Sequence, residues 1–238
     1  VALLAESEPN DASTSAMEIP GNAIVEGALA AAVGEGADKD DEPADGSAKG
    51  AKTKPRRPRL RLIDADWYRL AAPSEMGLIS RVELRDAPDC GGLEVWRGGE
   101  KTALLKTRWE RRQRPLLDAL RRDEGELLIR VTCVSRSSPE VERAGYRLAV
   151  TTRPRRLDEE GEPNDIVGPE TALIPMGPGV QATLAHRGDA DVFRLDLAAA
   201  VPAEALVLGV TGVPGVSLSV QLLDEAGEKV VLERRPPR

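Results

Sequence analysis

The side chains best suited to chemistry in this chain belong to a six-residue string that occurs twice. Glu-x-Glu-Pro-Asn-Asp spans residues 6–11 and again residues 160–165. Each copy is followed further along by Asp-Ala-Asp, at residues 64–66 and 189–191. Carboxylate and amide oxygens are the ligands that a hard cation such as Ca²⁺ takes. The residue types therefore indicate a bound ion.

The ordered repetition of these strings predicts a duplicated domain. An aromatic-Arg-Leu sequence also occurs in both copies, at residues 68–70 and 193–195. A chain of 238 residues has room for two small domains. We therefore expect a first domain at residues 1–150, a linker at 151–159 and a second domain at 160–238.

Short runs of alternating apolar and polar residues dominate the sequence, which is the period of half-buried strands. Leu127, Ile129 and Val131 share one face of such a run, and Phe193 and Leu195 do so in the second half. Clusters of Gly and Pro separate the runs. The expected fold class is all-β, with two tandem antiparallel jelly-roll-like β-sandwich domains.

Two segments depart from this pattern. Residues 34–58 contain almost no large apolar side chain, which predicts a disordered, flexible insertion. Its acidic first part and basic second part indicate a solvated loop or, alternatively, docking of the basic part on an anionic polymer. At residues 115–122, a Pro followed by Leu116, Leu117 and Leu120 predicts one short helix.

The two halves are unequal in length. Gly-Glu-Lys occurs at residues 99–101 and 227–229, and the first copy then continues through two further strands to about residue 150. The second copy has no room for these strands before residue 238 and is expected to be C-terminally incomplete. Either the chain is a fragment of a longer protein, or a partner donates the missing strands to open sheet edges.

Composition narrows the function classes further. A formal net charge of -7 argues against a nucleic-acid-binding module, which carries a basic surface. No apolar run approaches the roughly 18 to 20 residues needed to cross a bilayer, so no transmembrane segment is expected. Cys90 and Cys133 are too few for a zinc cage. They form either one disulfide, contributing about 4 kcal/mol in the loop-entropy model, or two buried free thiols.

Catalysis is not predicted. A Ser-His-Asp or Cys-His arrangement would have to use His186, the single histidine, and no Gly-x-Ser-x-Gly sequence accompanies it. The neighbours of His186 indicate a hairpin tip. The sequence also contains no phosphate loop and no dinucleotide fingerprint. We therefore expect a protein that is not an enzyme.

The order of the motifs resembles the bacterial pre-peptidase C-terminal domain family. The shared features are Glu-Pro-Asn-Asp, a strand pair, Asp-x-Asp with an aromatic residue, and a closing Gly-Tyr-x-Leu-x-Val strand, here at residues 145–150. The resemblance covers residues 6–150, with the insertion set aside, and about 160–234. It implies a jelly-roll-like β-sandwich of exported bacterial proteins, and hence an extracytoplasmic location: periplasmic, associated with the outer membrane, or secreted.

In family members similar to collagenase binding domains, the acidic segment and the Asp-x-Asp loop together hold calcium. Carried over to this chain, the resemblance implies the candidate ligands Glu6, Glu8, Asn10, Asp11, Asp64 and Asp66, and in the second copy Glu160, Glu162, Asn164, Asp165, Asp189 and Asp191. Calcium takes six to eight oxygen ligands, and clustered carboxylates without a counter-charge repel one another. The alternative is that Asn10 and Asp11 cap a turn while Asp64 and Asp66 lie at a strand entry.

Three tryptophans, Trp67, Trp96 and Trp109, are candidates for an outward-facing binding surface. An exposed Trp can stack on a sugar or fill a partner's pocket, and it can equally cap the edge of a sandwich. Tyr68 and Phe193 are expected to point inward. Because aromatic residues make up only 3% of the chain, collagen binding is not carried over from the family.

The sequence as a whole favours a non-catalytic binding or structural module of an exported bacterial envelope or extracellular protein, stabilised by calcium. Its partner would be another protein or an extracellular polymer. One alternative is an accessory part of a secreted peptidase whose catalytic domain lies outside these residues. Another is a subunit of an envelope assembly held in place by strand addition.

Overall fold

The structure is a computed structural model. It describes residues 1–29, 61–87, 91–108, 114–123, 125–135, 144–165, 167–168, 171–174, 177, 179–184, 189–195, 197, 207–212 and 216–235. The predicted insertion at residues 34–58 lies outside the described residues. The chain divides into two units: unit 1 contains Val1–Leu157 and Gly161–Pro163, and unit 2 contains Asp158–Glu160, Asn164–Leu184 and Gly188–Arg238. The described residues are almost entirely strands, turns and loops, which confirms the all-β fold class.

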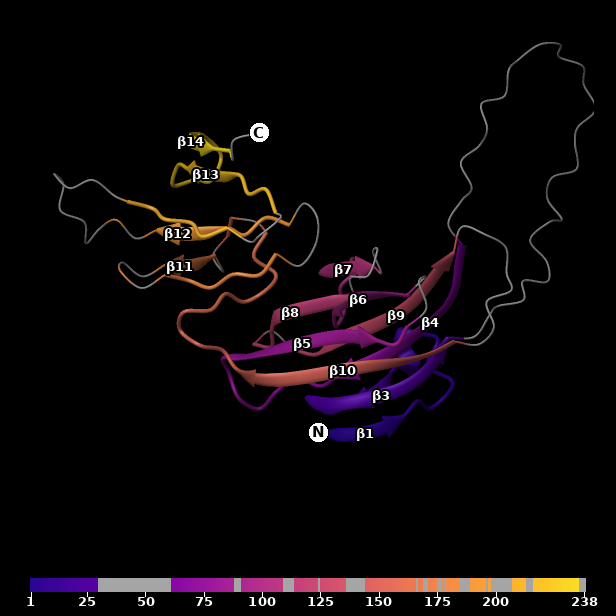
Figure 1. Ribbon diagram of the computed structural model, residues 1–238. Coiled ribbons are helices and arrows are strands. Elements are labelled where there is room, and N and C mark those ends of the chain that lie inside the picture. Colours follow the sequence, from indigo (N-terminus) through magenta and orange to yellow (C-terminus); the bar gives the residue numbers. More distant parts are fainter. Residues whose placement is uncertain are drawn as a thin grey trace, which may run out of the picture. The chain divides into compact units, whose positions relative to one another are not determined.

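Unit 1 is built from two five-stranded sheets (Figure 1). In order across the first sheet, the strands are β1 (Ala2–Ala5), β3 (Asn22–Leu29), β10 (Ala144–Pro154), β5 (Leu78–Arg85) and β8 (Leu116–Arg121). Across the second sheet they are β2 (Met17–Ile19), β4 (Arg61–Leu70), β9 (Leu127–Ser135), β6 (Gly91–Arg97) and β7 (Leu105–Arg108). One short 3-10 helix, Ser13–Ser15, precedes β2.

The sheets are antiparallel except at one edge of each. β1 pairs with β3 in parallel, and β2 pairs with β4 in parallel. The two parallel pairs follow from the connections: β2 lies between β1 and β3 in the chain but belongs to the other sheet, and a strand pair joined by such a crossover can be parallel, whereas a hairpin cannot. The other pairs of these two sheets are antiparallel, as the sequence predicts.

The core of unit 1 lies between the two sheets, and the alternating pattern puts it there. In β9, Ile129 and Val131 are 0% exposed, and in β10 Leu148 is 0% exposed. Within the sheets, Ile129 pairs with Tyr68 of the neighbouring strand β4, and Leu148 pairs with Leu84 of the neighbouring strand β5. Each strand therefore contributes alternate side chains to one apolar cluster that joins both sheets.

The helix predicted at residues 115–122 is wrong, because this segment is strand β8. Leu117 and Leu120 are both buried although they are three residues apart, a spacing that imitates a helix. The register explains the spacing: Val82 pairs with Leu117 but Ser80 pairs with Leu120, so β8 contains a bulge. Within the bulge Ala119 has a φ of 55°. The extra residue returns Leu120 to the inner face after three positions instead of two.

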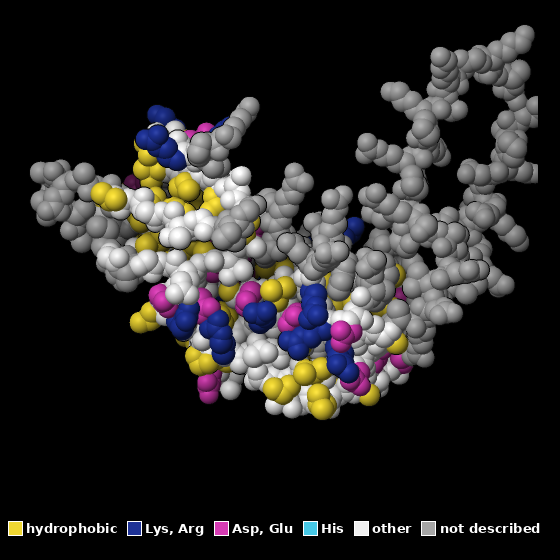
Figure 2. All heavy atoms as spheres, in the orientation of Figure 1, with side chains coloured by type: hydrophobic (Ala, Val, Ile, Leu, Met, Phe, Trp, Pro, Cys, Tyr) yellow, Lys and Arg dark blue, Asp and Glu magenta, His cyan; other side chains and the backbone are white. Residues whose placement is uncertain are grey.

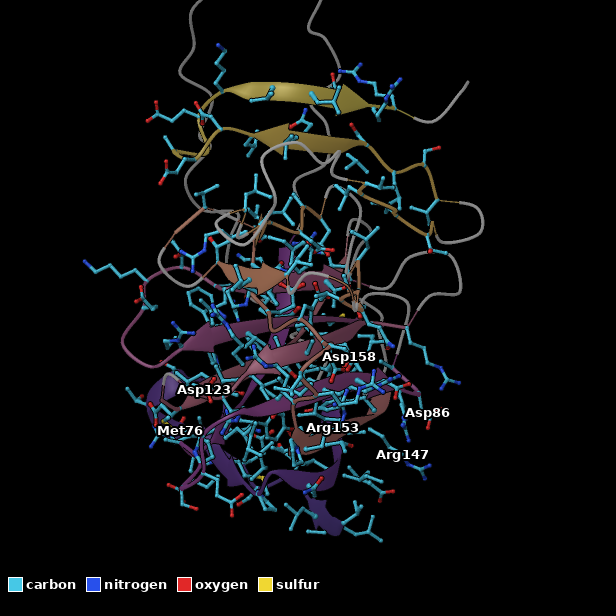
Figure 3. The ribbon with its side chains drawn as sticks, turned by 90° about the vertical axis from the view of Figure 1, so that its left-hand side faces the viewer. Met76, Asp86, Asp123, Arg147, Arg153 and Asp158 are labelled. Atoms are coloured by element: carbon cyan, nitrogen blue, oxygen red, sulfur yellow. The ribbon has the colours of Figure 1, made fainter. Side chains whose placement is uncertain are left out.

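The outer face of the first sheet carries charges of both signs. Arg147 and Arg153 project from β10 on this face (Figure 3). Arg147 forms ion pairs with Glu26 at 3.1 Å and with Asp86 at 3.6 Å. Lys or Arg side chains lie next to Asp or Glu side chains across unit 1 (Figure 2). Such exposed pairs contribute little to stability, so they favour solubility rather than the fold.

Unit 2 contains two separate pairs of strands among its described residues. β11 (Ala172–Ile174) pairs in parallel with β12 (Phe193–Leu195), and β13 (Val220–Leu223) pairs in antiparallel with β14 (Val230–Arg234). Leu208 and Val210 alternate with other residues as in a strand, but both side chains are exposed and residues 207–210 belong to no strand.

No helix in the described ranges is both long enough and apolar enough to cross a membrane.

Candidate metal centre

The first acidic segment is tied to both sheets of unit 1. It follows β1, and the Glu6 N–H donates to the carbonyl oxygen of Glu26 on β3 at 2.9 Å. Four residues later, the Trp67 N–H of β4 donates to the carbonyl oxygen of Asn10 at 2.8 Å. The segment therefore bridges the sheets and brings its side chains to Asp64 and Asp66, which lie on β4. We call Glu6, Glu8, Asn10, Asp11, Asp64 and Asp66 the first acidic cluster.

Glu6 holds this segment in place through both of its carboxylate oxygens. Its Oε1 accepts hydrogen bonds from Asn10 Nδ2 at 2.9 Å and from the Tyr68 hydroxyl at 2.9 Å. Its Oε2 accepts one from the Ala28 N–H at 2.8 Å. Burial by itself raises the pKa of Glu6, but these donors favour the carboxylate form and hold the pKa below its usual value. Glu6 is therefore an anchor, because both of its carboxylate oxygens are engaged by hydrogen-bond donors.

Asp66 has the opposite character. It is 0% exposed, and burial raises its pKa to about 8, with the negative charges of Glu6 and Asp64 acting in the same direction. The Tyr146 hydroxyl donates to Asp66 Oδ2 at 2.6 Å. The Tyr68 and Tyr146 hydroxyls also contact each other. Two hydroxyl protons cannot satisfy all the oxygen contacts among these four side chains, and a proton on Asp66 supplies a further donor.

Two buried oxygens of the first cluster have no hydrogen-bond partner among the described residues. They are Asn10 Oδ1 and Asp66 Oδ1. Asn10 is 0% exposed, and its Nδ2 is committed to Glu6. A buried acceptor without a donor costs about 1–3 kcal/mol, so a positive group in contact with both oxygens would remove this cost.

Carboxylates of the first acidic cluster are close enough to share one cation. Ligand oxygens of Asp11, Asp64 and Asp66 all lie within 4.8 Å of one another, as do those of Glu6, Glu8 and Asp66. Two ligands on opposite sides of a Ca²⁺ ion are separated by about 4.6–5.2 Å, twice the usual Ca–O distance. The residues present therefore fit a calcium ion, with Asn10, Asp11, Asp64 and Asp66 as ligands and Glu6 as the group that orients Asn10.

Unit 2 repeats the same backbone geometry. The Val192 N–H donates to the carbonyl oxygen of Asn164 at 3.0 Å, as Trp67 does to Asn10. Asn164 Nδ2 donates to Glu160 Oε2 at 3.0 Å, and the Thr183 N–H donates to Glu160 Oε1. We call Glu160, Asn164, Asp165, Asp189 and Asp191 the second acidic cluster.

In the second acidic cluster Asp191 is the counterpart of Asp66, and its buried Oδ1 has no hydrogen-bond partner among the described residues. Burial, together with the nearby charges of Asp189 and Asp165, raises the pKa of Asp191 to about 6. Burial also raises the pKa of Glu160, to about 7, with a contribution from the charge of Asp191. The sequence motif explains the difference from Glu6: Phe193 stands where the first copy has Tyr68, and a phenyl ring cannot donate to a carboxylate.

Glu162 belongs to unit 1, where its backbone extends the first sheet. Its N–H donates to the carbonyl oxygen of Ala119 at 2.8 Å, and its carbonyl oxygen accepts from the Arg121 N–H at 2.9 Å. Glu162 thus forms a parallel bridge with Leu120 on the free side of β8. In the first copy, Glu8 has a different local role, because its Oε2 accepts from the Asn10 N–H at 3.0 Å.

The predicted tryptophan surface is partly described. Trp67 and Trp96 lie on the outer face of the second sheet, with ring centroids 5.8 Å apart. The Arg130 guanidinium lies 5.2 Å from the Trp67 ring centroid, and the Lys106 ammonium lies 5.6 Å from that of Trp96. Glu94 joins the two cations at 3.3 and 3.6 Å. Both rings are half-buried under charged side chains, so a ligand would have to displace or share these cations. Trp109 lies outside the described residues.

The cysteines can be placed only in part. Cys133 is buried in β9 at 1% exposed and is disulfide-bonded. Cys90 lies outside the described residues, as does His186, so the pairing and the predicted hairpin tip stay predictions.

Two tyrosines that contact the first acidic cluster were not predicted from the sequence to do so. Tyr68 and Tyr146 are indeed core residues, at 0% and 2% exposed. Their hydroxyls, however, reach the carboxylates at the end of the core. A signal was present in the sequence: a Tyr on an inward position needs a hydrogen-bond partner for its hydroxyl, and the acidic motif offers several.

Comparison with known proteins gives little further information. No protein-family model matches the chain. No curated protein matches it either. Among solved structures, the chain is similar to the pre-peptidase C-terminal domain of collagenase from Bacillus anthracis, with a TM-score of 0.35 and 11% identity over 61% of this chain and 100% of that chain. This similarity concerns the fold at most.

Proposed function

We propose that this chain is a non-catalytic binding or structural module of an exported protein, and that each acidic cluster holds one calcium ion. The observation that carries the proposal is the pair of buried oxygens, Asn10 Oδ1 and Asp66 Oδ1, that have no hydrogen-bond partner among the described residues. One carboxylate oxygen each of Asp11, Asp64 and Asp66 lies within 4.8 Å of the other two. A cation satisfies both oxygens and neutralises the carboxylates, which a water molecule would do only in part.

The acidic segment at residues 6–11 connects the two sheets of unit 1, and this suggests how a bound ion would stabilise the fold. Residues 6–11 are hydrogen-bonded to β3 through Glu6 and to β4 through Asn10. Asn10, Asp64 and Asp66 would hold the ion, and their shared contact with it would strengthen the connection between the two sheets. The bound ion supplies positive charge. Glu6 orients Asn10, and the Tyr68 and Tyr146 hydroxyls donate to Glu6 Oε1 and to Asp66 Oδ2, respectively.

The test is calcium titration by isothermal calorimetry at neutral pH. We expect two binding events per chain in the unaltered protein, one event in Asp66→Asn and one in Asp191→Asn. Asp86→Asn is the matched control, because Asp86 is an exposed carboxylate paired with Arg147 and is remote in sequence from both motifs. It should retain two events. Absence of binding heat together with an unchanged melting temperature in calcium would reject the ion.

The binding role itself is tested separately. In the proposal, the rigid face that carries Trp67 and Trp96 contacts a protein or an extracellular polymer. Trp96→Ala should weaken capture of the native partner by the full-length protein, while Arg147→Ala, on the outer face of the other sheet, should not. Equal capture by both variants would remove this face from the proposal.

A further inference from the structure

The outer face of the second sheet of unit 1 carries two tryptophans beside a row of charged side chains. In the register, Arg130 of β9 pairs with Trp67 of β4 on one side and with Glu94 of β6 on the other. Glu94 in turn pairs with Lys106 of β7. Trp96 occupies the next outward position of β6 after Glu94. Four strands therefore place aromatic rings and charges side by side on one face.

This part of the face is positively charged, although the chain as a whole has a formal net charge of -7. The outward positions of β9, β6 and β7 carry three cations, Arg130, Lys106 and Arg108, and one acid, Glu94. The Glu94 side chain is 14% exposed and lies between those of Lys106, at 56%, and Arg130, at 21%. One shielded carboxylate therefore faces three cations, so the complementary partner is an anion.

Arg108 is the cation of this face that is most available to a ligand. It is exposed and forms no ion pair among the described residues. Its stem lies over Gly92 of β6, where an added Cβ would come within 3.3 Å of Arg108 Cγ. The missing side chain at Gly92 thus leaves room for Arg108 on the face, one outward position away from Glu94.

Two buried donors on the same face have no hydrogen-bond partner among the described residues. They are the indole Nε1–H of Trp96 and the Nε–H of Arg130. The Arg130 guanidinium donates to Glu94 Oε2 through its Nη1 atom, at 3.3 Å. A buried donor without an acceptor is unfavourable, and a ligand rich in acceptor oxygens would remove this penalty.

The two rings favour a sugar over a protein side chain. Their centroids are 5.8 Å apart at an interplanar angle of 50°, and each ring has a cation within 6 Å of its centroid. Protein hot spots are aromatic side chains in desolvated pockets, whereas these rings are half-buried beneath charges. The polarised C–H groups of a pyranose are attracted to an indole face as a cation is, and carboxylates on the same sugar pair with the cations.

We propose that this face binds an acidic polysaccharide, a chain of sugars that bear carboxylates. The inference rests on the proposed binding role of the face that carries Trp67 and Trp96, and it names the class of ligand. The sugar rings pack on the two indoles, while the carboxylates pair with Arg108, Arg130 and Lys106. The Lys106 ammonium, 5.6 Å from the Trp96 ring centroid, moves to a ligand carboxylate and uncovers the ring.

Biolayer interferometry with an immobilised oligogalacturonate tests the class of ligand. The matched probe is the same oligomer with its carboxylates methyl-esterified, and chelator is present so that calcium bridges neither probe to the protein. We expect the esterified probe to bind at least about tenfold more weakly, because exposed ion pairs contribute about two- to fivefold each and three cations lose their partners. The acidic probe should also change tryptophan emission, and its binding should weaken as salt is added.

Chain variants make the test specific for this face. Arg108→Ala and Lys106→Ala should each weaken binding of the acidic probe about two- to fivefold. Arg147→Ala, on the outer face of the first sheet, should leave it unchanged. Near-UV circular dichroism in chelator confirms that each protein is folded. Equal losses in Arg108→Ala and Arg147→Ala would overturn the inference, since the attraction would then not depend on this face.

The outcomes also separate the inference from the binding role on which it rests. If Trp96→Ala weakens capture of the native partner but the oligogalacturonate does not bind, the face remains a binding surface and the class of ligand is wrong. If poly-L-glutamate binds as tightly as the oligogalacturonate, the face recognises acidic peptides, and the inference is again overturned. If Trp96→Ala leaves capture of the native partner unchanged, the proposed role of the face is lost, and the inference with it.

Discussion

The carbonyl oxygen of Asn10 accepts the N–H of Trp67 at 2.8 Å, and this single bond fixes where the acidic segment meets β4. It brings Asn10 to the part of β4 that carries Asp66, one residue before Trp67. The corresponding bond in unit 2 joins Asn164 to Val192 at 3.0 Å. Because the bond involves only backbone atoms, it tolerates the change from Trp to Val. Both copies can therefore present the same oxygen atoms as metal ligands.

Removal of the Tyr146 hydroxyl should destabilise unit 1. Tyr146→Phe retains the ring in the core but leaves the buried Oδ2 of Asp66 without its donor at 2.6 Å. We expect a loss of about 1–3 kcal/mol in the free energy of unfolding, the usual cost of an unsatisfied buried acceptor. Urea denaturation of the calcium-free protein, followed by tryptophan fluorescence, measures it. A change below about 0.5 kcal/mol, within the range of neutral surface substitutions, would show that this hydroxyl does not support the cluster.

The calcium-free protein should lose stability as the pH rises. Burial raises the pKa of Asp66 to about 8 from an ordinary value of 3.8. An acid whose pKa is higher in the folded state binds more protons when folded, so its contribution is present below the unfolded pKa and is lost between about pH 4 and pH 8. Tryptophan fluorescence follows unit 1, since all three tryptophans lie before residue 110. The lowered pKa of Glu6 acts in the opposite direction at acid pH, so the measurement belongs above pH 5.

The control for this pH dependence is Asp66→Asn, which cannot titrate. In chelator its unfolding free energy should fall less between pH 5 and pH 8 than that of the unaltered protein. An equal slope in both proteins would mean that Asp66 is not the group responsible.

The bulge in β8 offers a stabilising substitution. Ala119 has a φ of 55°, in the left-handed region where an L-residue is strained by roughly 1–2 kcal/mol. Ala119→Gly should relieve this strain and, after the greater freedom of Gly in the unfolded chain is subtracted, stabilise unit 1 by about 0.5 kcal/mol. Ala119→Val should destabilise it by more than that. If thermal denaturation shows the Val variant to be as stable as the Gly variant, the bulge is not at this residue.

The disulfide of Cys133 should pair with Cys90, the other cysteine of the chain. Mass spectrometry after alkylation without reductant should find no modified thiol, and a peptide containing both cysteines should appear after proteolysis. Replacement of both by Ser should cost about 2–5 kcal/mol, as for other native disulfides. Two alkylated thiols in the unreduced protein would contradict the pairing.

The parts of the fold that follow period-two alternation could be predicted from the sequence, and the exceptions have local causes. Leu127, Ile129 and Val131 lie on the inner face as expected. The segment from Leu116 to Arg121 does not keep this alternation. A bulge changes the spacing of its inward residues from two to three, and this spacing imitates a helix. Parallel pairing at the sheet edges also escaped prediction, since alternation shows which face a residue takes but not the direction of its neighbour.

For the candidate site, too, the sequence indicates residue types but not their contacts. The motif proposes Asn10, Asp11, Asp64 and Asp66 as ligands, because carboxylate and amide oxygens are recognisable from residue type alone. It could not separate Glu6, whose oxygens are used by structural donors, from the residues that keep an oxygen without a hydrogen-bond partner among those described. That difference depends on hydrogen bonds between residues far apart in the sequence, which no single motif encodes.

A crystal structure of the protein grown with calcium, with anomalous difference maps at a long wavelength, would show whether the acidic clusters bind calcium. We expect a peak within about 2.3–2.6 Å of Asn10 Oδ1 and Asp66 Oδ1, and a second peak beside Asp191 Oδ1. Maps without these peaks, in which water or a protein donor satisfies the three oxygens instead, would contradict calcium binding.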